Sequence, residues 1–535
     1  MKRYYGPLAA AVFALAALSL KPWAMNFVLN DDWAYSLPVQ TLHERGGLIL
    51  TDWSPHTQVL QILWGWLWTL PFGFSLGTLK LSVIFIATAG IWLFHLLLRE
   101  TGADDWCSAA AALCLAFNPL FFLLSESFMT DVPYLVLVIA STLAFLKWRN
   151  GKMPLQICSL GCAGAVLIHQ TGLLLPAAFS LMPGPGERPG VKQLLYLWLP
   201  ALAVFGCWSL WLHGGTHVPA VMNAIGLELC NFYSDPSVAF SAIIMRLAQT
   251  ALYLGFFAAP LSAALLFDAD FRRELAENYV LAAVCLLGYL GLSFSTGGPT
   301  AIGNIINSTG LGNIAILDGQ KTAGIFGLAF FWPAIAAIST ISALILAVSL
   351  SKYRNVRIQP LLAVFGMQFA APMCMSNFFD RYLIYLLPLL LAAAAVRLHN
   401  CKTVAKVLPW AIALMGIFTW AGTSDYLSWN RAKWQLAYSA QKYGIKPEEV
   451  TAGFDYDGWH NYERNADKVI HDKTANEWSW RAFSTTKAAV TFSIPSQKNG
   501  DLLEKLNYYT PISPFRRGTL YLVKVTQEER KSMTN

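Results

Sequence analysis

The stretch LSVIFIATAGIWLFHLLL, residues 81–98, decides the fold class of this protein. It contains no Asp, Glu, Lys or Arg. The hydrocarbon core of a bilayer is about 30 Å thick, and a helix of roughly 20 apolar residues crosses it. The stretch therefore predicts a membrane-spanning helix, and similar runs recur along the chain.

The composition of the whole chain agrees with this prediction. Of its 535 residues, 56% are apolar and 13% are charged. Soluble globular chains average about 45–50% apolar and about 25% charged residues. So many apolar side chains cannot be buried in one aqueous core, which excludes a soluble enzyme, a disordered chain and a disulfide scaffold. The net charge of +7 does not require a nucleic-acid partner, because basic residues in short cytoplasmic loops give the same excess.

Further apolar runs give the number of expected spans. They lie at 6–28, 107–125, 132–148, 193–212, 247–267, 278–295, 322–350, 359–375, 383–396 and 407–424. Two stretches are ambiguous: 58–73 is short and rich in Trp, and 155–181 is long enough for two short helices broken around His169 to Gly172. We expect an α-helical polytopic membrane protein of about 13 spans, with 58–73 lying along the membrane interface and 155–181 forming a hairpin.

The distribution of basic residues gives an orientation. In this register, the basic clusters at 147–152, 188–192, 272–273, 352–357 and 402–406 all fall on one side. The positive-inside rule makes that side cytoplasmic, with a cytoplasmic N-terminus and an external C-terminus. Residues 1–424 then form the membrane domain. Residues 425–535 form a small external α/β domain, with strand-like runs at 489–494 and 519–525.

Acidic side chains in the external segments are the candidates for chemistry. The first external loop reads Asn30-Asp31-Asp32-Trp33-Ala34-Tyr35. Adjacent carboxylates raise each other's pKa, and they can act as a base or as oxygen ligands of a divalent cation. The same residues can equally be a helix cap, since Asp is favoured at that position.

Two other external segments carry similar ambiguities. Asp131 stands before Val132 and Pro133, so it can be a cap or a functional acid. Arg381 lies in Asn377-Phe378-Phe379-Asp380-Arg381-Tyr382. It can pair with Asp380, or it can present its planar fork of donors to a phosphate. Three such sites at one membrane face favour a functional interpretation more than each does alone.

Together these segments resemble the motifs of a known superfamily. Asp31-Asp32, with Tyr35 after them, is similar to the Asp-Glu motif of GT-C glycosyltransferases, in particular protein O-mannosyltransferases, aminoarabinose transferases and related bacterial transferases. Asp131-Val132-Pro133 resembles their second acidic motif. Arg381-Tyr382-Leu383, with Pro388, resembles a late signature, and Gly453–Trp459 is similar to part of the external domain of some members. One departure is Ser54-Pro55-His56-Thr57, which supplies no lysine where those families often carry His-Pro-Pro or Lys-Pro.

The resemblance implies a GT-C-like fold and an inverting glycosyltransferase in a bacterial inner membrane. It implies a polyprenyl-phosphate (undecaprenyl-phosphate) sugar donor and a hydroxyl acceptor on a lipid, glycan or protein at the external, periplasmic face. The implied site residues are grouped by role. Asp31, Asp32 and Asp131 are catalytic; Arg381, His56 and Tyr382 bind the donor phosphate; Tyr35 and Lys321 bind substrate. The charge of the leaving phosphate is balanced either by Arg381 or by a divalent cation, Mg or Mn, held by Asp31, Asp32 and Asp131.

Other interpretations stay open at this point. Lys321 ends a Gly- and Asn-rich loop, residues 296–321, which is an active-site cover or a plain connector. A transporter or a lipid-linked sugar flippase is the main alternative function. Transporters place ionisable residues near the membrane midplane and often show inverted repeats. The spans here are almost free of charge in their interior and no repeat is evident, which favours the enzyme. A non-catalytic scaffold with a glycan-binding external domain is the third possibility.

Overall fold

The computed structural model describes residues 4–182, 190–215, 218–296, 298–321, 324–351, 358–398, 404–471, 486–494, 502–512 and 517–525. The first half of the chain is helical. Its helices are α1 (Tyr5–Leu18), α2 (Asp32–Arg45), α3 (Val59–Phe72), α4 (Leu76–Glu100), α5 (Asp105–Ala116), α6 (Pro119–Ser125), α7 (Asp131–Arg149), α8 (Leu155–Ile168), α9 (Leu174–Ser180), α10 (Val191–Gly214), α11 (Ala220–Ser234) and α12 (Pro236–Leu265).

The second half combines helices with short strands. Its helices are α13 (Ala269–Glu277), α14 (Tyr279–Thr296), α15 (Phe331–Ser351), α16 (Gln359–Met373), α17 (Leu387–Arg397), α18 (Val404–Ser439) and α19 (Phe454–His471). Its strands are β1 (Ile306–Asn307), β2 (Gly310–Leu311), β3 (Ala315–Ile316), β4 (Gly319–Gln320), β5 (Val450–Thr451), β6 (Ala488–Thr491), β7 (Leu502–Tyr509) and β8 (Arg517–Lys524).

The protein is a multi-pass membrane protein. Within the described residues, seven helices are long and apolar enough to cross a membrane, or eight if the bent pair α5–α6 is one span. Shorter apolar helices include α3, α8 and α17. The polytopic helical fold is thus confirmed, while the count of about 13 spans stays a prediction. Stretch 58–73 forms the single 14-residue helix α3, and stretch 155–181 breaks at His169 as expected, where a 3₁₀ turn covers Gln170–Leu173.

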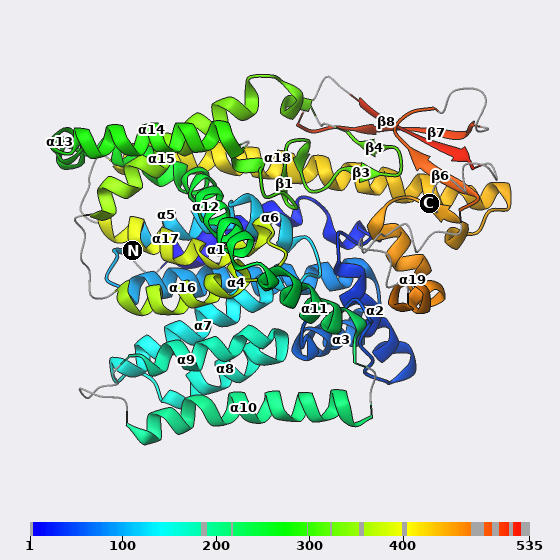
Figure 1. Ribbon diagram of the computed structural model, residues 1–535, viewed down its shortest axis with the longest axis horizontal. Coiled ribbons are helices and arrows are strands. Elements are labelled where there is room, and N and C mark those ends of the chain that lie inside the picture. Colours follow the sequence, from blue (N-terminus) through cyan, green and yellow to red (C-terminus); the bar gives the residue numbers. More distant parts are fainter. Residues whose placement is uncertain are drawn as a thin grey trace.

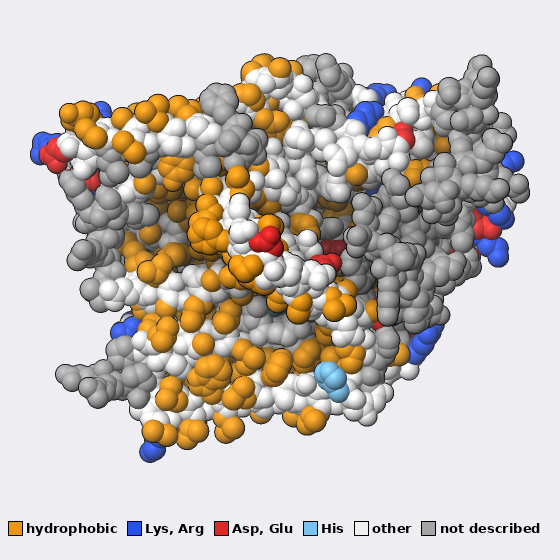
Figure 2. Space-filling model, in the orientation of Figure 1, with side chains coloured by type: hydrophobic (Ala, Val, Ile, Leu, Met, Phe, Trp, Pro, Cys, Tyr) orange, Lys and Arg blue, Asp and Glu red, His pale blue; other side chains and the backbone are white. Residues whose placement is uncertain are grey.

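The long helices lie side by side from α10 on one flank to α14, α15 and α18 on the other (Figure 1). The N-terminus lies at one end of this bundle, and α2, α3, α19 and the C-terminal sheet lie at the opposite end. Apolar side chains cover the face shown in Figure 2 over most of the bundle. Large apolar side chains of several helices are exposed, such as Leu210 (76%) of α10 and Trp410 (78%) of α18. Exposed apolar area on this scale suits hydrocarbon rather than water.

Small residues allow the helices to approach closely. Gly90 of α4 faces Val136 of α7, and Gly161 of α8 faces Ser141, so that a Cβ at either glycine would collide with its neighbour. In a membrane, such small-residue contacts increase van der Waals packing between helices, which is a main source of their association.

The segment between α14 and α15 folds into two small hairpins, β1–β2 and β3–β4. It is anchored at both ends. The side chain of Asp380 accepts hydrogen bonds from the backbone N–H groups of Ile305 and Ile306, and Asp318 accepts from those of Phe492 and Ser493. The loop therefore connects the segment that carries Arg381 to the C-terminal sheet.

The C-terminal region carries the expected small sheet. Its strand order is β5-β6-β8-β7, with β5 and β6 parallel and the other pairs antiparallel. Strands β6 and β8 confirm the runs predicted at 489–494 and 519–525. The 36-residue helix α18 continues through residues 424 and 425 and contacts β7 and β8 (Figure 1). The proposed division of the chain at 424/425 therefore falls inside a helix.

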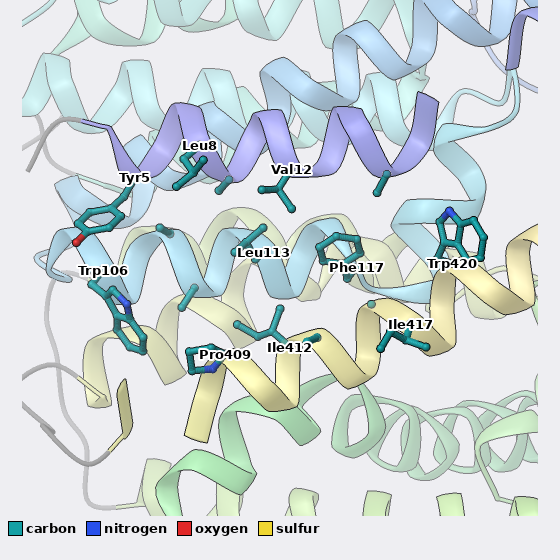
Figure 3. A pocket seen from close by; sticks show the side chains of 16 residues that line it. Tyr5, Leu8, Val12, Trp106, Leu113, Phe117, Pro409, Ile412, Ile417 and Trp420 are labelled. Carbon is teal, nitrogen blue, oxygen red and sulfur yellow. The ribbon is translucent and has the colours of Figure 1, made fainter. Parts of the chain in front are cut away.

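A cavity of about 710 Å³ opens between α1, α5 and α18. Figure 3 shows Tyr5 and Trp106 near one end and Trp420 near the other, with aliphatic side chains such as Leu113 and Ile412 between them. Its lining offers hydrocarbon contacts and contains no carboxylate, histidine, lysine or arginine. The residues that can carry chemistry lie elsewhere.

Candidate active site

Asp31 lies at the start of α2, where it pairs with a residue 350 positions away. Its Oδ2 is 3.0 Å from Nη1 of Arg381, and its Oδ1 accepts a hydrogen bond from Trp53 Nε1 at 3.1 Å. The side chain makes no capping hydrogen bond to α2. The cap interpretation thus fails for Asp31, and the carboxylate is available to the site.

Arg381 stands in a 3₁₀ segment, Asp380–Tyr385, between α16 and α17. Its guanidinium carbon lies 5.2 Å from the ring centre of Phe379 and 5.5 Å from that of Tyr382. Burial opposes its charge, yet Tyr382, Asp131 and Asp31 together hold the pKa of Arg381 well above its ordinary value. Its buried Nε has no hydrogen-bond partner among the described residues. A buried cation with an unpaired donor is suited to receive an anion.

Two more predicted residues join this cluster. Asp131, the first residue of α7, lies within electrostatic reach of Arg381 and Asp31. Tyr35, one turn into α2, is 2% exposed and interacts electrostatically with Asp31, Arg381 and Asp131. Burial raises the pKa of Tyr35 well above its ordinary value, so its hydroxyl stays neutral and can donate a hydrogen bond.

His56 approaches the same cluster together with His169, for which the sequence favoured a packing role over a place in the substrate cavity. The ring centres of His56 and His169 are 3.9 Å apart. Burial, and then the charge of Arg381, lower the pKa of His169 to about 3. Burial and the neighbouring His169 lower the pKa of His56 well below its ordinary value. Both rings are therefore neutral near pH 7, and each can donate one hydrogen bond without adding charge.

Asp32 faces the other way. Its Oδ1 accepts a hydrogen bond from Leu29 N at 2.7 Å, and its Oδ2 accepts one from Phe128 N at 3.2 Å and lies 3.7 Å from Lys80 Nζ. Its side chain is 1% exposed, and burial raises its pKa to about 6 despite the charge of Lys80. Asp32 therefore joins the first loop to the 126–130 segment rather than facing Arg381.

Lys80 and Glu126 complete this second cluster, and neither was predicted as a site residue. Lys80 Nζ donates a hydrogen bond to the carbonyl of Phe27 at 2.6 Å. Glu126 is fully buried, and neither of its carboxyl oxygens has a hydrogen-bond partner among the described residues. Burial, partly offset by Lys80, raises the pKa of Glu126 to about 8.

The last two predicted residues, Tyr382 and Lys321, lie in different parts of the structure. Tyr382 stays beside Arg381. Lys321 lies at the C-terminal sheet, where its Nζ is 5.7 Å from the ring centre of Phe492. Among the contacts of the described residues, none joins Lys321 to Asp31 or Arg381.

The predicted metal ligands are not assembled as one set. Asp31 and Asp131 face Arg381, whereas Asp32 is held by two backbone N–H groups and Lys80. Across the described part of the chain, no group of three or more His, Cys, Asp or Glu side chains is placed to hold a metal ion. The three carboxylates therefore do not form one oxygen-ligand set for a divalent cation.

Comparisons with known proteins found similarity only among solved structures. No family model and no curated protein matches the sequence. The fold is similar to that of ArnT from Cupriavidus metallidurans bound to undecaprenyl phosphate, with 13% identity and a TM-score of 0.42 over 96% of this chain and 97% of that one. It is also similar to the archaeal oligosaccharyltransferase AglB from Archaeoglobus fulgidus in complex with an inhibitory peptide and a dolichol-phosphate. The identity is 12% and the TM-score is 0.39, over 91% of this chain and 69% of that one. The apo form of the A. fulgidus oligosaccharyltransferase is similar as well, with 15% identity and a TM-score of 0.43 over 91% of this chain and 70% of that one.

Proposed function

We propose that this protein is an inverting membrane glycosyltransferase that moves a sugar from a polyprenyl-phosphate donor to a hydroxyl acceptor. One observation carries the proposal: Asp31, Asp131 and Arg381, each from a separate GT-C-like motif, meet in one partly buried cluster. Buried ionisable side chains that interact with one another cluster at functional sites more often than elsewhere. The external face, a bacterial inner membrane and an external domain from about residue 425 belong to the same proposal.

Arg381 binds the donor phosphate. Its planar fork matches two phosphate oxygens, and its Nε is unpaired in the described structure. When a phosphate arrives, it competes with Asp31 for the guanidinium, while Trp53 still holds the other carboxylate oxygen. The neutral rings of His56 and His169 supply further donors. They take the place of the lysine that the sequence lacks.

Asp31 is the general base. Its carboxylate accepts the proton of the acceptor hydroxyl as that oxygen attacks the anomeric carbon from the face opposite the phosphate. The new carbon–oxygen bond forms while the bond to the phosphate oxygen breaks, and both electrons of that bond leave with the polyprenyl phosphate. The second negative charge that develops on this leaving phosphate is stabilised by Arg381. Asp131 adds a second negative charge near Arg381 and so stabilises the guanidinium in its buried position.

The test uses purified protein in lipid nanodiscs with a panel of sugars on undecaprenyl phosphate and dolichol phosphate, which are lipids held in two of the similar structures. Loss of sugar-lipid is followed in the presence of membrane extract as the acceptor source. We expect one donor class to be consumed by the wild type and by Glu277→Gln, which changes an exposed carboxylate on α13, but not by Asp31→Asn.

A chelator arm tests the metal question separately. Full activity in the chelator supports Arg381 as the cation that balances the phosphate charge. Loss of activity that Mg or Mn restores shows a metal-dependent reaction and contradicts that assignment. If the wild type consumes no donor, the transferase proposal fails, and lipid-flip assays would test the flippase alternative.

A further inference from the structure

Two further cavities lie beside α19, and neither Asp31 nor Arg381 lines them. The larger one, of about 440 Å³, is lined by Trp23, Ala24, Asn26, residues 74–77, Tyr438 and Trp459. The smaller one, of about 250 Å³, lies between α2 and α19. Trp459 lines both cavities. The two cavities are therefore neighbours on either side of Trp459, and together they are called the groove.

The larger cavity has aromatic walls. The rings of Phe74 and Trp459 are parallel to within 3°, with centres 6.5 Å apart. Trp23, on the opposite segment, is 57% exposed. The side chains of Asn26 and Ser75 add hydrogen-bonding groups, and no lining side chain is charged. Aromatic faces with a few polar groups and no charge suit a neutral, amphipathic ligand.

The smaller cavity is polar. Gln40, Thr41, Glu44, Arg45 and His460 line it together with Leu37 and Trp459. These side chains offer both donors and acceptors along the exposed side of α2. A ligand that extends from one cavity into the other therefore meets an aromatic surface first and a hydrogen-bonding surface next.

Carbohydrates have the matching chemistry. A pyranose ring presents a face of C–H groups, which carry partial positive charge and pack on the electron-rich face of an indole. Its hydroxyls point outward from the ring edge and pair with side chains or ordered water. Phospholipid headgroups carry a phosphate, and no cationic side chain lines the larger cavity. Two adjoining cavities that share one indole fit consecutive sugar units.

The groove is connected to the proposed reaction centre by packed aromatic rings. Gly458, next to Trp459, lies against the ring of Trp33, where a Cβ would come within 2.7 Å of the indole nitrogen. Trp33 packs on Trp53 with ring centres 6.0 Å apart, and Trp53 Nε1 bonds to Asp31. Helix α2, which supplies the polar cavity, begins directly after Asp31.

We infer that the groove on either side of Trp459 binds the acceptor, and that this acceptor is a glycan of at least two sugar units. This inference rests on the proposed transferase function, because it names the acceptor class for the same reaction. Binding in the groove holds the glycan beside the first external loop, so that a terminal hydroxyl can reach Asp31.

The test measures glycan binding without donor, which separates it from catalysis. Protein in nanodiscs is titrated with maltohexaose, chitohexaose and a hexamer of galacturonate, and saturation-transfer NMR reports ligand contact. We expect at least one neutral hexasaccharide to bind the wild type. Trp459→Ala should weaken that binding about three- to tenfold, the usual contribution of one aromatic contact, and Trp459→Phe should recover part of it.

Matched variants keep the result interpretable. Trp410→Ala removes an exposed indole from the apolar face of α18 and should leave glycan binding unchanged. Trp23→Ala tests the opposite wall of the groove if Trp459→Ala does not fold, and it should also weaken binding. Equal effects of Trp410→Ala and Trp459→Ala would overturn the inference.

Failure of the inference and failure of the transferase proposal give different results. If no hexasaccharide binds while the donor is still consumed, the glycan groove is wrong and the transferase stands. If glycan binds through Trp459 and no donor is consumed, the groove stands and the transferase proposal fails. If vesicles of anionic phospholipid displace all binding from the groove, it is a lipid-headgroup surface and the inference is overturned.

Discussion

Asp31 and Asp32 are neighbours in the chain, yet they belong to two different clusters. Asp31 forms an ion pair with Arg381, and Asp131 lies within electrostatic reach of both. Asp32 is held by Lys80 and two backbone N–H groups at 1% exposure. In the proposed mechanism, one residue of this acidic dipeptide is the general base and the other is a structural anchor. The Asp32–Lys80–Glu126 cluster, called the anchor below, fixes the loop that presents Asp31.

The largest effect on stability should follow from breaking the anchor. Lys80→Met leaves Asp32 buried without its cation, and breaking such a buried pair typically costs about 3 to 5 kcal/mol. Thermal unfolding in detergent measures it. Lys442→Met removes an exposed ion pair with Glu504 and should cost less than about 1 kcal/mol. Equal losses for the two variants would contradict a structural role for the anchor.

Arg381 should show the opposite profile, with its main effect on turnover. We expect Arg381→Lys to lower turnover about 10²- to 10³-fold, because an ammonium cannot form the two-pronged contact with phosphate. Donor consumption measures the effect. Arg397→Lys alters an arginine that pairs with Glu274 and should stay within about twofold of wild type. A fully active Arg381→Lys would remove the arginine from phosphate binding.

The anchor should also make stability depend on pH. Glu126 ionises near 4.5 in an unfolded chain and near 8 in the folded one. Between these values the folded state binds the extra proton, so its stability falls as pH rises. Lowering the pH from 8 to 6 should therefore stabilise the wild type by about 2 kcal/mol through this group. Glu126→Gln should remove this pH-dependent stabilisation. If the stability of this variant depended on pH as steeply as that of the wild type, Glu126 would not be buried as described.

The smallest effect should come from the contact between the 298–321 loop and the C-terminal sheet. Asp318 is exposed and accepts hydrogen bonds from Phe492 and Ser493. Asp318→Ala should cost less than about 1 kcal/mol of stability and should speed limited proteolysis within the loop. Turnover should change less than it does in Arg381→Lys. A total loss of turnover would show that the loop has a direct part in the reaction.

The lengths of the apolar runs predicted much of the helical fold, because a helix must be long and apolar enough to cross the membrane. The break at His169 and the strands β6 and β8 were also readable, since breaker residues and β-branched runs mark them locally. The sequence did not predict strand β7 or the continuation of α18 past residue 424. Polar residues in both allow several local structures, and tertiary packing decides among them.

The site was predictable only in part for a similar reason. Motif order indicated Asp31, Asp131 and Arg381, and the structure brings them together. The partner of Asp32 was not readable, because Lys80 directly precedes the apolar run at 81–98 and nothing local pairs the two. The location of Lys321 at the C-terminal sheet depends on two hairpins whose strands have only two residues each, which is too short for a sequence signal.

The most direct test of the different roles of Asp31 and Asp32 compares Asp31→Asn with Asp32→Asn under the same conditions. Turnover and melting temperature are measured on each variant. The account predicts that Asp31→Asn loses at least about 100-fold in turnover and keeps a melting temperature close to that of wild type. Asp32→Asn should melt several degrees lower, since its backbone donors and Lys80 lose their anion, and the folded fraction should still consume donor. The reverse pattern, with an active Asp31→Asn and a stable but inactive Asp32→Asn, would contradict the account.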